Sequence, residues 1–202
     1  MTVSLRVAKP SDGAAVAGLY APYVRETSIT FEYDVPTGEE FGQRIATVLK
    51  LAPWLLAVET GPGGEKLLGY AYGGTWRTRV AYRWVIETAV YVAQDQHRRG
   101  IGRALYVALL GLLRLQGFCR AIGGITLPNP GSVGLHEALG FTFVGTYPKC
   151  GFKQGTWWDV GFWDLELQPH PKEPKETLGM AELMARPEAL AVLHDAASRV
   201  RN

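Results

Sequence analysis

The basic, glycine-containing segment His97-Arg98-Arg99-Gly100-Ile101-Gly102-Arg103 has residue types and spacing suited to holding phosphate groups. It follows an apolar, β-branched run (85–92) and opens an apolar helical stretch (104–115). A turn from a strand into a helix exposes unpaired backbone N–H groups at the positive end of the helix dipole. Such a turn can bind a phosphate or pyrophosphate, and Arg99 and Arg103 add positive charge. Taken alone, the same residues equally fit an ordinary strand-to-helix turn with a basic rim.

The segment does not match two other glycine-containing phosphate loops. It lacks the Gly-Lys-Ser/Thr ending of a nucleotide P-loop. Its glycines are also spaced differently from the three glycines of the Rossmann fingerprint, which sits near the start of a βαβ unit.

Two ionisable side chains, Glu87 and His136, are candidates for proton transfer. Glu87 interrupts an otherwise apolar strand (84–90), where a carboxylate needs a partner, a solvent-filled cleft or a raised pKa. A structural ion pair explains one such residue almost as well as a general base does. His136 falls in a predicted helix and can exchange a proton near neutral pH, although a lone helix histidine is more often structural. Tyr106 and Tyr147 are secondary candidates, better explained by packing in the core or at its rim.

Arg77 and Arg79 are two residues apart, so both can approach one carboxylate if their segment is extended. Without further context, a solvated hairpin end explains them better. The spacing of cysteines and histidines indicates no metal site, because Cys119 and Cys150 are far apart and the four histidines form no HExxH pattern. The patterns therefore predict anion binding and proton transfer without a metal.

An alternation of strands and helices must position these residues. Ser11 is expected to cap the first helix, and Thr37-Gly38-Glu39-Glu40 matches a capping box before the second. Gly61-Pro62-Gly63-Gly64 predicts a hairpin turn, and Gly117 ends the helix that starts at Ile101. The expected strands are 4–8, 54–59, 66–75, 84–92, 119–127, 141–147 and 157–167, and the expected helices are 12–24, 41–51, 101–116 and a short one between Asn129 and Gly140.

This order of elements, βααβββαβαββ, predicts an α/β (α+β) fold. Parallel strands need a long connection, so pairing should be parallel only where a helix intervenes and antiparallel elsewhere. The expected result is a mixed, twisted, mostly antiparallel sheet of about seven strands with helices on both faces.

Residues 1–168 are expected to form one domain, and a proline-rich linker and helical tail follow over 169–202. Apolar spacing in the tail predicts a helix docked on the domain. The residues that carry this spacing are Leu190, Leu193, His194 and Ala197. A tail contact between two copies of the chain is a weaker alternative.

The composition limits which binding partners and which cellular compartment are expected. At 202 residues, with 47% hydrophobic and 20% charged residues, the chain can bury a substantial core. The net charge of +2 is too small to indicate nucleic-acid or membrane binding. The longest apolar run, 104–113, is half of the roughly 20 residues that cross a bilayer, and residues 1–7 do not match a signal peptide. With two scattered cysteines, we expect a cytoplasmic location.

Ordered stretches over residues 3–168 resemble one known family. They include Glu26-Thr27-Ser28, Pro53-Trp54, Gly69-Tyr70-Ala71-Tyr72, Ala81-Tyr82-Arg83-Trp84, Glu87-Thr88-Ala89-Val90-Tyr91-Val92, Leu127-Pro128-Asn129, Leu135-His136-Glu137-Ala138-Leu139-Gly140-Phe141 and Gly151-Phe152-Lys153-Gln154-Gly155-Thr156-Trp157-Trp158-Asp159-Val160-Gly161-Phe162-Trp163. The pattern His97-x-x-Gly100-x-Gly102 resembles the pyrophosphate loop, Gln/Arg-x-x-Gly-x-Gly/Ala, of GNAT-type N-acetyltransferases. The other stretches are similar to the phosphinothricin and methionine-sulfone/sulfoximine branch of that family.

The resemblance implies how the cosubstrate acetyl-CoA is held. Backbone N–H groups of the loop face the pyrophosphate, and strand 89–92 lies beside the pantetheine arm, where it splays from the following parallel strand. His97 departs from the family's Gln or Arg, and a solvated loop histidine is the alternative. Asn129 is expected on the pantetheine arm, with a helix cap as its alternative. The implied cofactor residues are Val90, Tyr91, Val92, His97, Arg98, Arg99, Gly100, Ile101, Gly102, Arg103, Asn129 and Ser132.

The resemblance also implies roles for the ionisable residues. Glu87 is the expected base for the substrate ammonium group. His136 is the second catalytic candidate, as an acid or as a base. Many GNAT enzymes have at this place a tyrosine that protonates the leaving thiolate, and the phosphinothricin branch has this histidine. The oxygens of the acceptor are expected on the arginine-containing segment after the third strand. The implied substrate-binding residues are Phe31, Arg77, Arg79 and Tyr82.

The resemblance thus implies an N-acetyltransferase for a small amino-acid-like amine of the phosphinothricin, methionine sulfone or methionine sulfoximine type. Attack is expected to be direct, in a ternary complex. A homodimer and a detoxifying role are expected as well, and neither a nucleic acid nor a membrane is an expected partner. One alternative is a GNAT enzyme for a peptide N-terminus, a polyamine or another amine. The other is an acyl-CoA-binding module without turnover.

Overall fold

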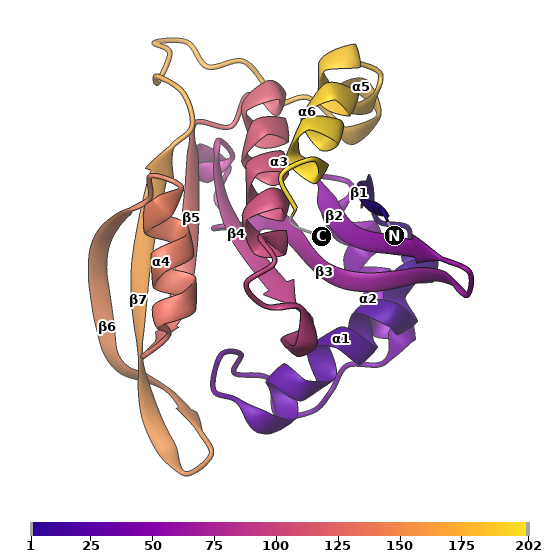
Figure 1. The fold of residues 1–202 in the computed structure, drawn as a ribbon. Coiled ribbons are helices and arrows are strands. Elements are labelled where there is room, and N and C mark those ends of the chain that lie inside the picture. The colour runs from indigo at the N-terminus through magenta and orange to yellow at the C-terminus, as the bar shows by residue number, and fades with distance from the viewer. Residues whose placement is uncertain (1, 201–202) are drawn as a thin grey trace.

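Seven strands form one continuous sheet (Figure 1). The computed structural model describes residues 2–200. The strands are β1 (Thr2–Val7), β2 (Trp54–Gly61), β3 (Gly64–Thr75), β4 (Val85–Val92), β5 (Arg120–Leu127), β6 (Thr142–Lys153) and β7 (Thr156–Glu166). The helices are α1 (Gly13–Glu26), α2 (Gly38–Val48), α3 (Ile101–Gln116), α4 (Pro130–Ala138), α5 (Met180–Met184) and α6 (Pro187–Ala197), with short 3-10 turns η1 (Pro10–Asp12), η2 (Val80–Tyr82) and η3 (Gln94–Gln96).

The strand order is β1-β2-β3-β4-β5-β7-β6, and every neighbouring pair is antiparallel except β4 and β5. The parallel pair is connected through α3, which confirms the predicted mixed and mostly antiparallel sheet. β4 and β5 pair only over Val85–Glu87 and Arg120–Ile122. Since β4 continues to Val92 and β5 to Leu127, the two strands then diverge, and the predicted splay is present.

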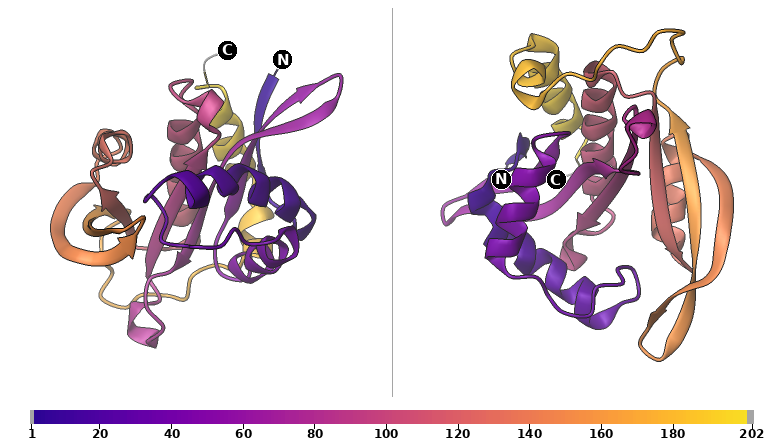
Figure 2. Two further views of the ribbon diagram at one scale, coloured as in Figure 1. Left: turned by 90° about the horizontal axis from the view of Figure 1, so that it is seen from below. Right: turned by 180° about the vertical axis from the view of Figure 1, so that it is seen from behind.

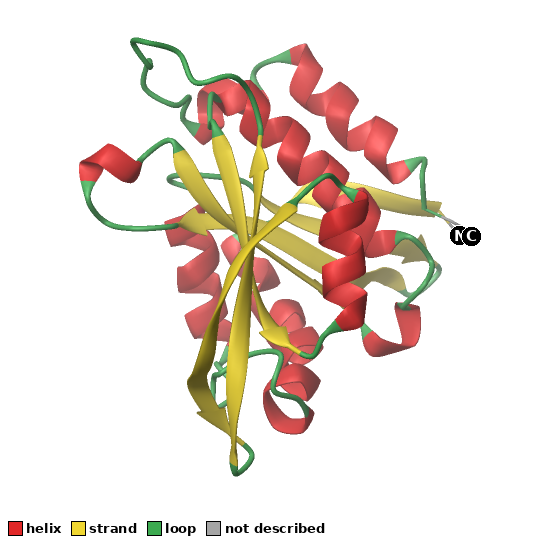
Figure 3. Ribbon diagram, turned by 90° about the vertical axis from the view of Figure 1, so that its left-hand side faces the viewer, coloured by secondary structure: helices red, strands yellow, loops and turns green. Residues whose placement is uncertain are grey.

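The sheet separates two apolar cores, with helices on both of its faces (Figure 3). One core lies under α1 and α2 and is rich in aromatic rings, among them Trp54, Tyr70 and Tyr91. The other surrounds α3. α3 is apolar over most of its circumference because it is packed between the sheet and the C-terminal helices.

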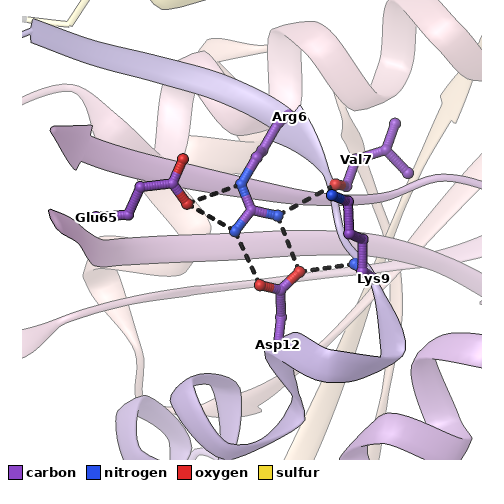
Figure 4. A network of polar contacts seen from close by, with 5 residues as sticks. All are labelled: Arg6, Val7, Lys9, Asp12 and Glu65. Atoms are coloured by element: carbon purple, nitrogen blue, oxygen red, sulfur yellow. Dashed lines mark hydrogen bonds and ion pairs between the residues drawn. The ribbon is translucent and has the colours of Figure 1, made fainter.

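The structure corrects the expected cap of the first helix. Ser11 lies inside the turn η1, and α1 begins after Asp12. The Asp12 carboxylate accepts hydrogen bonds from the Lys9 backbone N–H at 2.7 Å and from the Arg6 guanidinium at 2.8 and 2.9 Å (Figure 4). Arg6 also pairs with Glu65 at 2.9 Å. The hydrogen bond from Arg6 to Asp12 lowers the pKa of the Asp12 carboxyl. The Asp12 carboxylate, bound to the Arg6 guanidinium of β1, therefore anchors this turn, and Glu65 of β3 holds Arg6 in place.

Local signals at the other helix ends are confirmed. Thr37 and Glu40 form the capping box of α2, with N–H to side-chain distances of 3.1 and 2.6 Å. This box sets the first helical residue at Gly38, so the predicted start at residue 41 was too late. Gly117 ends α3 with a φ of +98°, a conformation that favours glycine.

The C-terminal helices α5 and α6 pack along α3, and α6 also contacts β1 (Figure 1 and Figure 2). α6 docks through Ala189, Leu193 and Ala196, which are buried, whereas Leu190 is 60% exposed. The predicted helix thus docks on the body through a face shifted by one residue from the expected one. Small side chains at the contact let the two helix axes approach closely, which explains why alanines and not Leu190 face inward.

Candidate active site

A cleft of about 580 Å³ lies between β4, the loop before α3 and the start of α4. Segments far apart in the sequence meet in it. Its lining includes nearly all of the residues predicted for the cofactor, namely Val90, Tyr91, Val92, His97, Arg98, Gly100, Ile101, Gly102, Arg103, Asn129 and Ser132, together with Tyr23, Ile29, Gln96, Gly131 and Leu135.

The loop before α3 has the backbone geometry of an anion site. Arg98 and Gly100 have positive φ angles of 66° and 83°, and Gly100 is the N-cap of α3. Left-handed residues in such a turn can direct neighbouring N–H groups toward one concavity. The first turn of α3 adds unpaired N–H groups and the positive end of a helix dipole. This end of the cleft is therefore suited to a pyrophosphate.

The other end of the cleft is bordered by the diverging part of β4. Beyond Glu87, β4 stays paired with β3 as far as Val92 but is no longer paired with β5. An extended chain that carries amide groups can add to such a strand edge through main-chain hydrogen bonds. An anion site at one end and an open strand edge at the other fit acetyl-CoA, which has a pyrophosphate and an amide-containing pantetheine arm. When bound, acetyl-CoA supplies the acetyl thioester.

The structure corrects the expected position of the Arg99 side chain. It pairs with Glu59 of β2 at 3.0 Å and donates to Gln96 through the other terminal nitrogen. Arg99 is also outside the lining of the cleft. The carboxylate of Glu59, 40 residues earlier in the chain, holds this guanidinium on the β2 side of the loop. Arg98 and Arg103 are the arginines that line the cleft.

His97 lines the cleft and contacts the end of β4. Its Nε2 lies 3.2 Å from the Val92 carbonyl oxygen and 3.2 Å from the Tyr23 hydroxyl. Tyr23 itself donates to the same carbonyl at 2.5 Å. His97 therefore belongs to a polar cluster that joins α1, β4 and the loop.

Asn129 serves as a helix cap and lines the cleft as well. Its Oδ1 accepts a hydrogen bond from the Ser132 N–H at 3.1 Å, which makes Asn129 the N-cap of α4. Both residues border the cleft. The alternative that Asn129 is a helix cap is confirmed. The side-chain amide nitrogen of Asn129 takes no part in this cap.

Glu87 projects from the part of β4 where the strands begin to diverge. Val90 and Val92 pack in the core around α3, and Tyr91 packs in the core under α1 and α2, so strand alternation directs Glu87 to the α1/α2 face. It is half-buried, and burial raises the pKa of its carboxyl. A Cβ on Gly124 of β5 would lie 3.5 Å from Glu87 Oε1, so this oxygen faces the splay.

His136 and Tyr106 form a buried pair, with relative exposures of 3% and 1%. His136 Nδ1 lies 2.8 Å from the Ser132 carbonyl oxygen, which only accepts, so Nδ1 carries the proton. Nε2 then accepts a hydrogen bond from the Tyr106 hydroxyl at 3.0 Å. Burial lowers the pKa of His136, which favours this neutral form. The arrangement can pass a proton between the phenol and the imidazole.

The two predicted catalytic groups lie on opposite faces of the sheet. A Cβ on Gly123 would meet His136 Nε2 at 2.5 Å, whereas one on Gly124 would approach Glu87. Successive residues of a strand point to opposite faces, so His136 lies on the α3 face and Glu87 on the α1/α2 face. Glu87 therefore faces the splay from the α1/α2 side, whereas the Tyr106–His136 pair is buried on the α3 side and is not part of the cleft lining.

Gly123→Ala is expected to displace His136, because the new Cβ would lie 2.5 Å from Nε2 and 2.7 Å from Cδ2. We expect the free energy of unfolding to fall by about 1–3 kcal/mol, the usual cost of overpacking a core. Urea titration measures it. The matched control is Gly134→Ala in α4, where a Cβ meets nothing within 4 Å and stability should not fall. Equal stability of the two variants would show that the histidine position is not fixed.

The predicted acceptor residues are not gathered at Glu87. Arg77, Arg79 and Tyr82 line a separate cavity of about 300 Å³ with Phe118. Arg77 lies over the ring of Trp76, 5.3 Å from its centroid. Trp76 in turn contacts Phe162 edge-on at 5.8 Å, and the Phe162 ring lies beside Gly124 on the Glu87 face. This loop therefore reaches the Glu87 region through Trp76 and not through its arginines.

Phe31 lies in the loop between α1 and α2, and its ring covers Gly151 of β6. Two hydrogen bonds fasten the same loop to the β6–β7 hairpin. Lys153 Nζ donates to the Thr30 carbonyl at 2.7 Å, and the Tyr33 hydroxyl donates to the Phe152 carbonyl at 2.5 Å. The loop and the hairpin thus meet on the α1/α2 side of the sheet, as an aromatic wall would require.

An aromatic pocket of about 420 Å³ on the Glu87 face was missed from the sequence. It is lined by Tyr20, Glu32, Glu40, Phe41, Gln43, Arg44, Thr47, Val48, Trp54, Tyr70, Tyr72 and Tyr91. Gly74 of β3 pairs with Glu87, so Tyr72, two residues earlier on the same face, lies between the pocket and the carboxylate. Burial and then the charge of Glu87 raise the pKa of Tyr72 to about 12. The alternation Gly69-Tyr70-Ala71-Tyr72 was the available signal, since it puts two tyrosines on one face.

None of the helices described within residues 2–200 combines the length and the apolar character needed to cross a membrane. Within the same residues, no group of three or more His, Cys, Asp or Glu side chains is placed to hold a metal ion.

Comparison with known proteins identifies the family. Residues 5–161 match the model of the acetyltransferase (GNAT) domain. A phosphinothricin N-acetyltransferase of Streptomyces viridochromogenes is 40% identical over 85% of this chain and 92% of its own. An L-methionine sulfoximine/L-methionine sulfone acetyltransferase of Pseudomonas paraeruginosa is 32% identical over 86% of this chain and 100% of its own.

A solved structure agrees with these matches. The phosphinothricin acetyltransferase of Sinorhizobium meliloti, in complex with acetyl-CoA, superposes with a TM-score of 0.81 at 31% identity. The match covers 91% of this chain and 99% of that one. With its divergent β4–β5 pair and its pyrophosphate-type loop, the chain belongs to the GNAT family of acetyl-CoA-dependent N-acetyltransferases.

Proposed function

We propose that this N-acetyltransferase acetylates the α-amino group of a small amino acid whose side chain carries an oxidised sulfur or phosphorus atom. Phosphinothricin, methionine sulfone and methionine sulfoximine are of this type, and relatives named for them match most of the chain. The observation that carries the proposal is the half-buried Glu87 carboxylate in the splay between β4 and β5, beside an aromatic pocket.

In the proposed reaction, Glu87 takes a proton from the acceptor's ammonium group, directly or through a water molecule, and the free amine attacks the thioester carbonyl. The N–H of Val90 or Tyr91 donates to the carbonyl oxygen, on which negative charge develops. As the amide forms, the attacking nitrogen loses a second proton and the departing thiolate gains one, and the Tyr106–His136 pair on the opposite face of the sheet is the proposed relay for this proton. The aromatic pocket beside Tyr72 has room for the acceptor's side chain.

Thiol release from acetyl-CoA tests this function. L-phosphinothricin, methionine sulfone, methionine sulfoximine and a simple amine would be assayed in parallel as acceptors. Release with one of the three amino acids, well above release with the simple amine, is the expected result. No thiol release with any of the three amino acids, despite measurable CoA binding, would overturn the proposed substrate class. Activity with peptide N-termini or polyamines would then identify a different acceptor, and silence there too would indicate an acyl-CoA-binding module.

Arg79→Ala tests whether the arginine-containing loop takes part in acceptor binding. Arg79 lies in a cavity apart from Glu87, so KM for a carboxylate-bearing acceptor should not change in the variant. A direct charge-assisted hydrogen bond contributes about 1.5–3 kcal/mol, and its loss would raise this KM about 10-fold or more. Arg186→Ala, an exposed arginine before α6, is the control for loss of charge. A rise in KM for the amino acid, with an unchanged KM for a simple amine, would instead place Arg79 at the acceptor.

The setting of the reaction is part of the same proposal. We place the enzyme in the cytoplasm, where free thiols such as Cys119 and Cys150 persist. We also propose a homodimer, because Phe143, Tyr147 and Trp157 expose aromatic surface on the β6–β7 hairpin. Acetylation of a toxic amino acid analogue would give the enzyme a detoxifying role.

A further inference from the structure

We infer that the C-terminal segment, residues 168–200, braces α3 and thereby holds the pyrophosphate loop in its binding conformation. The inference rests on the assignment of the loop to the cosubstrate and is independent of the acceptor. It concerns a part of the chain beyond residue 161, where the match to the family domain ends.

The first contact of the C-terminal segment that stabilises α3 lies at the C-terminal end of this helix. Gln116, the last residue of α3, donates through its side chain to the Leu178 carbonyl at 2.8 Å, and the Leu178 N–H donates to the Gln116 carbonyl at 2.8 Å. Close by in the chain, the Trp84 indole N–H donates to the Lys175 carbonyl at 2.7 Å. Leu178 is therefore held by a two-way hydrogen-bonded contact with the helix that it covers.

The middle of the brace is a close helix–helix contact. Leu183, Ala189 and Leu193 are buried in the core around α3. A Cβ on Gly111 of α3 would lie only 2.9 Å from a methyl group of Val192 in α6. Glycine at position 111 thus lets α6 pack directly on the α3 backbone, which is the tightest point of the contact.

The brace ends at the pyrophosphate loop. α6 runs antiparallel to α3, since Leu178 lies at Gln116 whereas the Arg199 carbonyl lies 3.5 Å from the position of a Cβ on Gly100. Val200 also packs against the core around α3. The negative end of α6 is thereby brought to the positive end of α3, where the two helix dipoles attract each other.

Covering α3 along its length has a consequence for binding. The N–H groups that face the pyrophosphate belong to the first turn of α3 and to its N-cap, Gly100. An anion is held well only if these donors keep their directions, so a loosely packed or fraying helix end would weaken it. β3 packs on one side of this end, where Gly69 lies against Ile101, and the C-terminal segment adds packing through Arg199 and Val200.

Gly111→Ala in the full-length chain tests the brace. The new methyl group would collide with Val192 and push α6 away, while alanine favours the helical conformation of α3 itself. We expect the dissociation constant for CoA, measured by calorimetry, to rise about 5-fold or more, the usual lower bound of coupling between sites. The double variant Gly111→Ala/Val192→Ala removes the colliding methyl groups and should restore CoA binding. A chain ending at Ala197 should show the same loss, whereas one ending at Val200 should not.

Acetyl-pantetheine, which lacks the pyrophosphate, separates bracing of the loop from general destabilisation. With acetyl-CoA, KM should rise in Gly111→Ala while kcat stays unchanged. With acetyl-pantetheine, kcat/KM should be the same for the variant and the wild type. Equal losses with the two thioesters, or unchanged CoA binding in both Gly111→Ala and the chain ending at Ala197, would overturn the inference. CoA binding needs no acceptor, so these outcomes are independent of the proposed substrate class.

Discussion

Glu87→Gln is expected to lower kcat about 10²- to 10⁴-fold, the range that a positioned general base contributes. Glutamine keeps the shape of the side chain in the splay but cannot accept a proton from the ammonium group. The cofactor cleft is lined by β4 residues from Val90 onward and does not include Glu87, so the dissociation constant for CoA should stay within about 2-fold of wild type. Steady-state thiol release and calorimetry measure the two quantities.

The pH profile distinguishes a base from a structural carboxylate. Burial raises the pKa of Glu87, and a base acts only when ionised, so kcat/KM should rise with pH through a pKa above the ordinary carboxyl value. In Glu87→Gln this acid limb should disappear. The exposed Glu39 of α2 provides the control, since Glu39→Gln should keep both the rate and the limb. Wild-type turnover in Glu87→Gln would remove Glu87 as the base.

The same substitution should not cost stability. Because the folded-state pKa of Glu87 is raised, the folded protein disfavours its carboxylate relative to the unfolded chain. That penalty is present at neutral pH and is relieved as the pH falls through the raised pKa. Replacing the carboxylate with a neutral amide removes the penalty, so the free energy of unfolding at pH 7 should be equal or higher. A folding defect would therefore not explain the lost turnover.

Gly100→Val is expected to weaken CoA binding about 10-fold or more. Gly100 has a φ of +83°, in the left-handed region that a β-branched residue rarely adopts, and the strain costs about 1–3 kcal/mol. If the valine leaves the positive-φ region, the N-cap rotates and its N–H groups turn away from the pyrophosphate. If the valine keeps the positive φ, its side chain would lie against the approaching phosphate and near the Arg199 carbonyl. Calorimetric titration with CoA measures the effect.

Two substitutions control this experiment. Asparagine tolerates the left-handed region, so Gly100→Asn should bind CoA more tightly than Gly100→Val. Gly155, in the turn between β6 and β7, has a similar φ of +73°, and a Cβ there meets nothing within 4 Å. Gly155→Val should therefore carry comparable backbone strain with unchanged CoA binding. Normal affinity in Gly100→Val would contradict the assignment of this loop to the pyrophosphate.

Features that depend on a few neighbouring residues could be predicted from short stretches of the chain. The period of apolar residues set α3, the Thr37/Glu40 pair set the start of α2, and Gly117 set the end of α3. The phosphate-binding loop from His97 to Arg103 could be predicted for the same reason, because a strand, glycines and an apolar helix follow one another directly. These features depend on backbone geometry and on partners within a few residues, and their free energies are local.

Contacts between separate segments, in contrast, select the partner of each polar or apolar side chain. Arg99 turns to Glu59, Asp12 replaces Ser11 at the first helix, and Leu190 points outward while its smaller neighbour Ala189 is buried. Strand register and alternation also placed Glu87 and His136 on opposite faces of the sheet, and gathered tyrosines from three elements into one pocket. The Arg99–Glu59 ion pair joins residues 40 apart in the sequence, and no local pattern encodes the distance between two such segments.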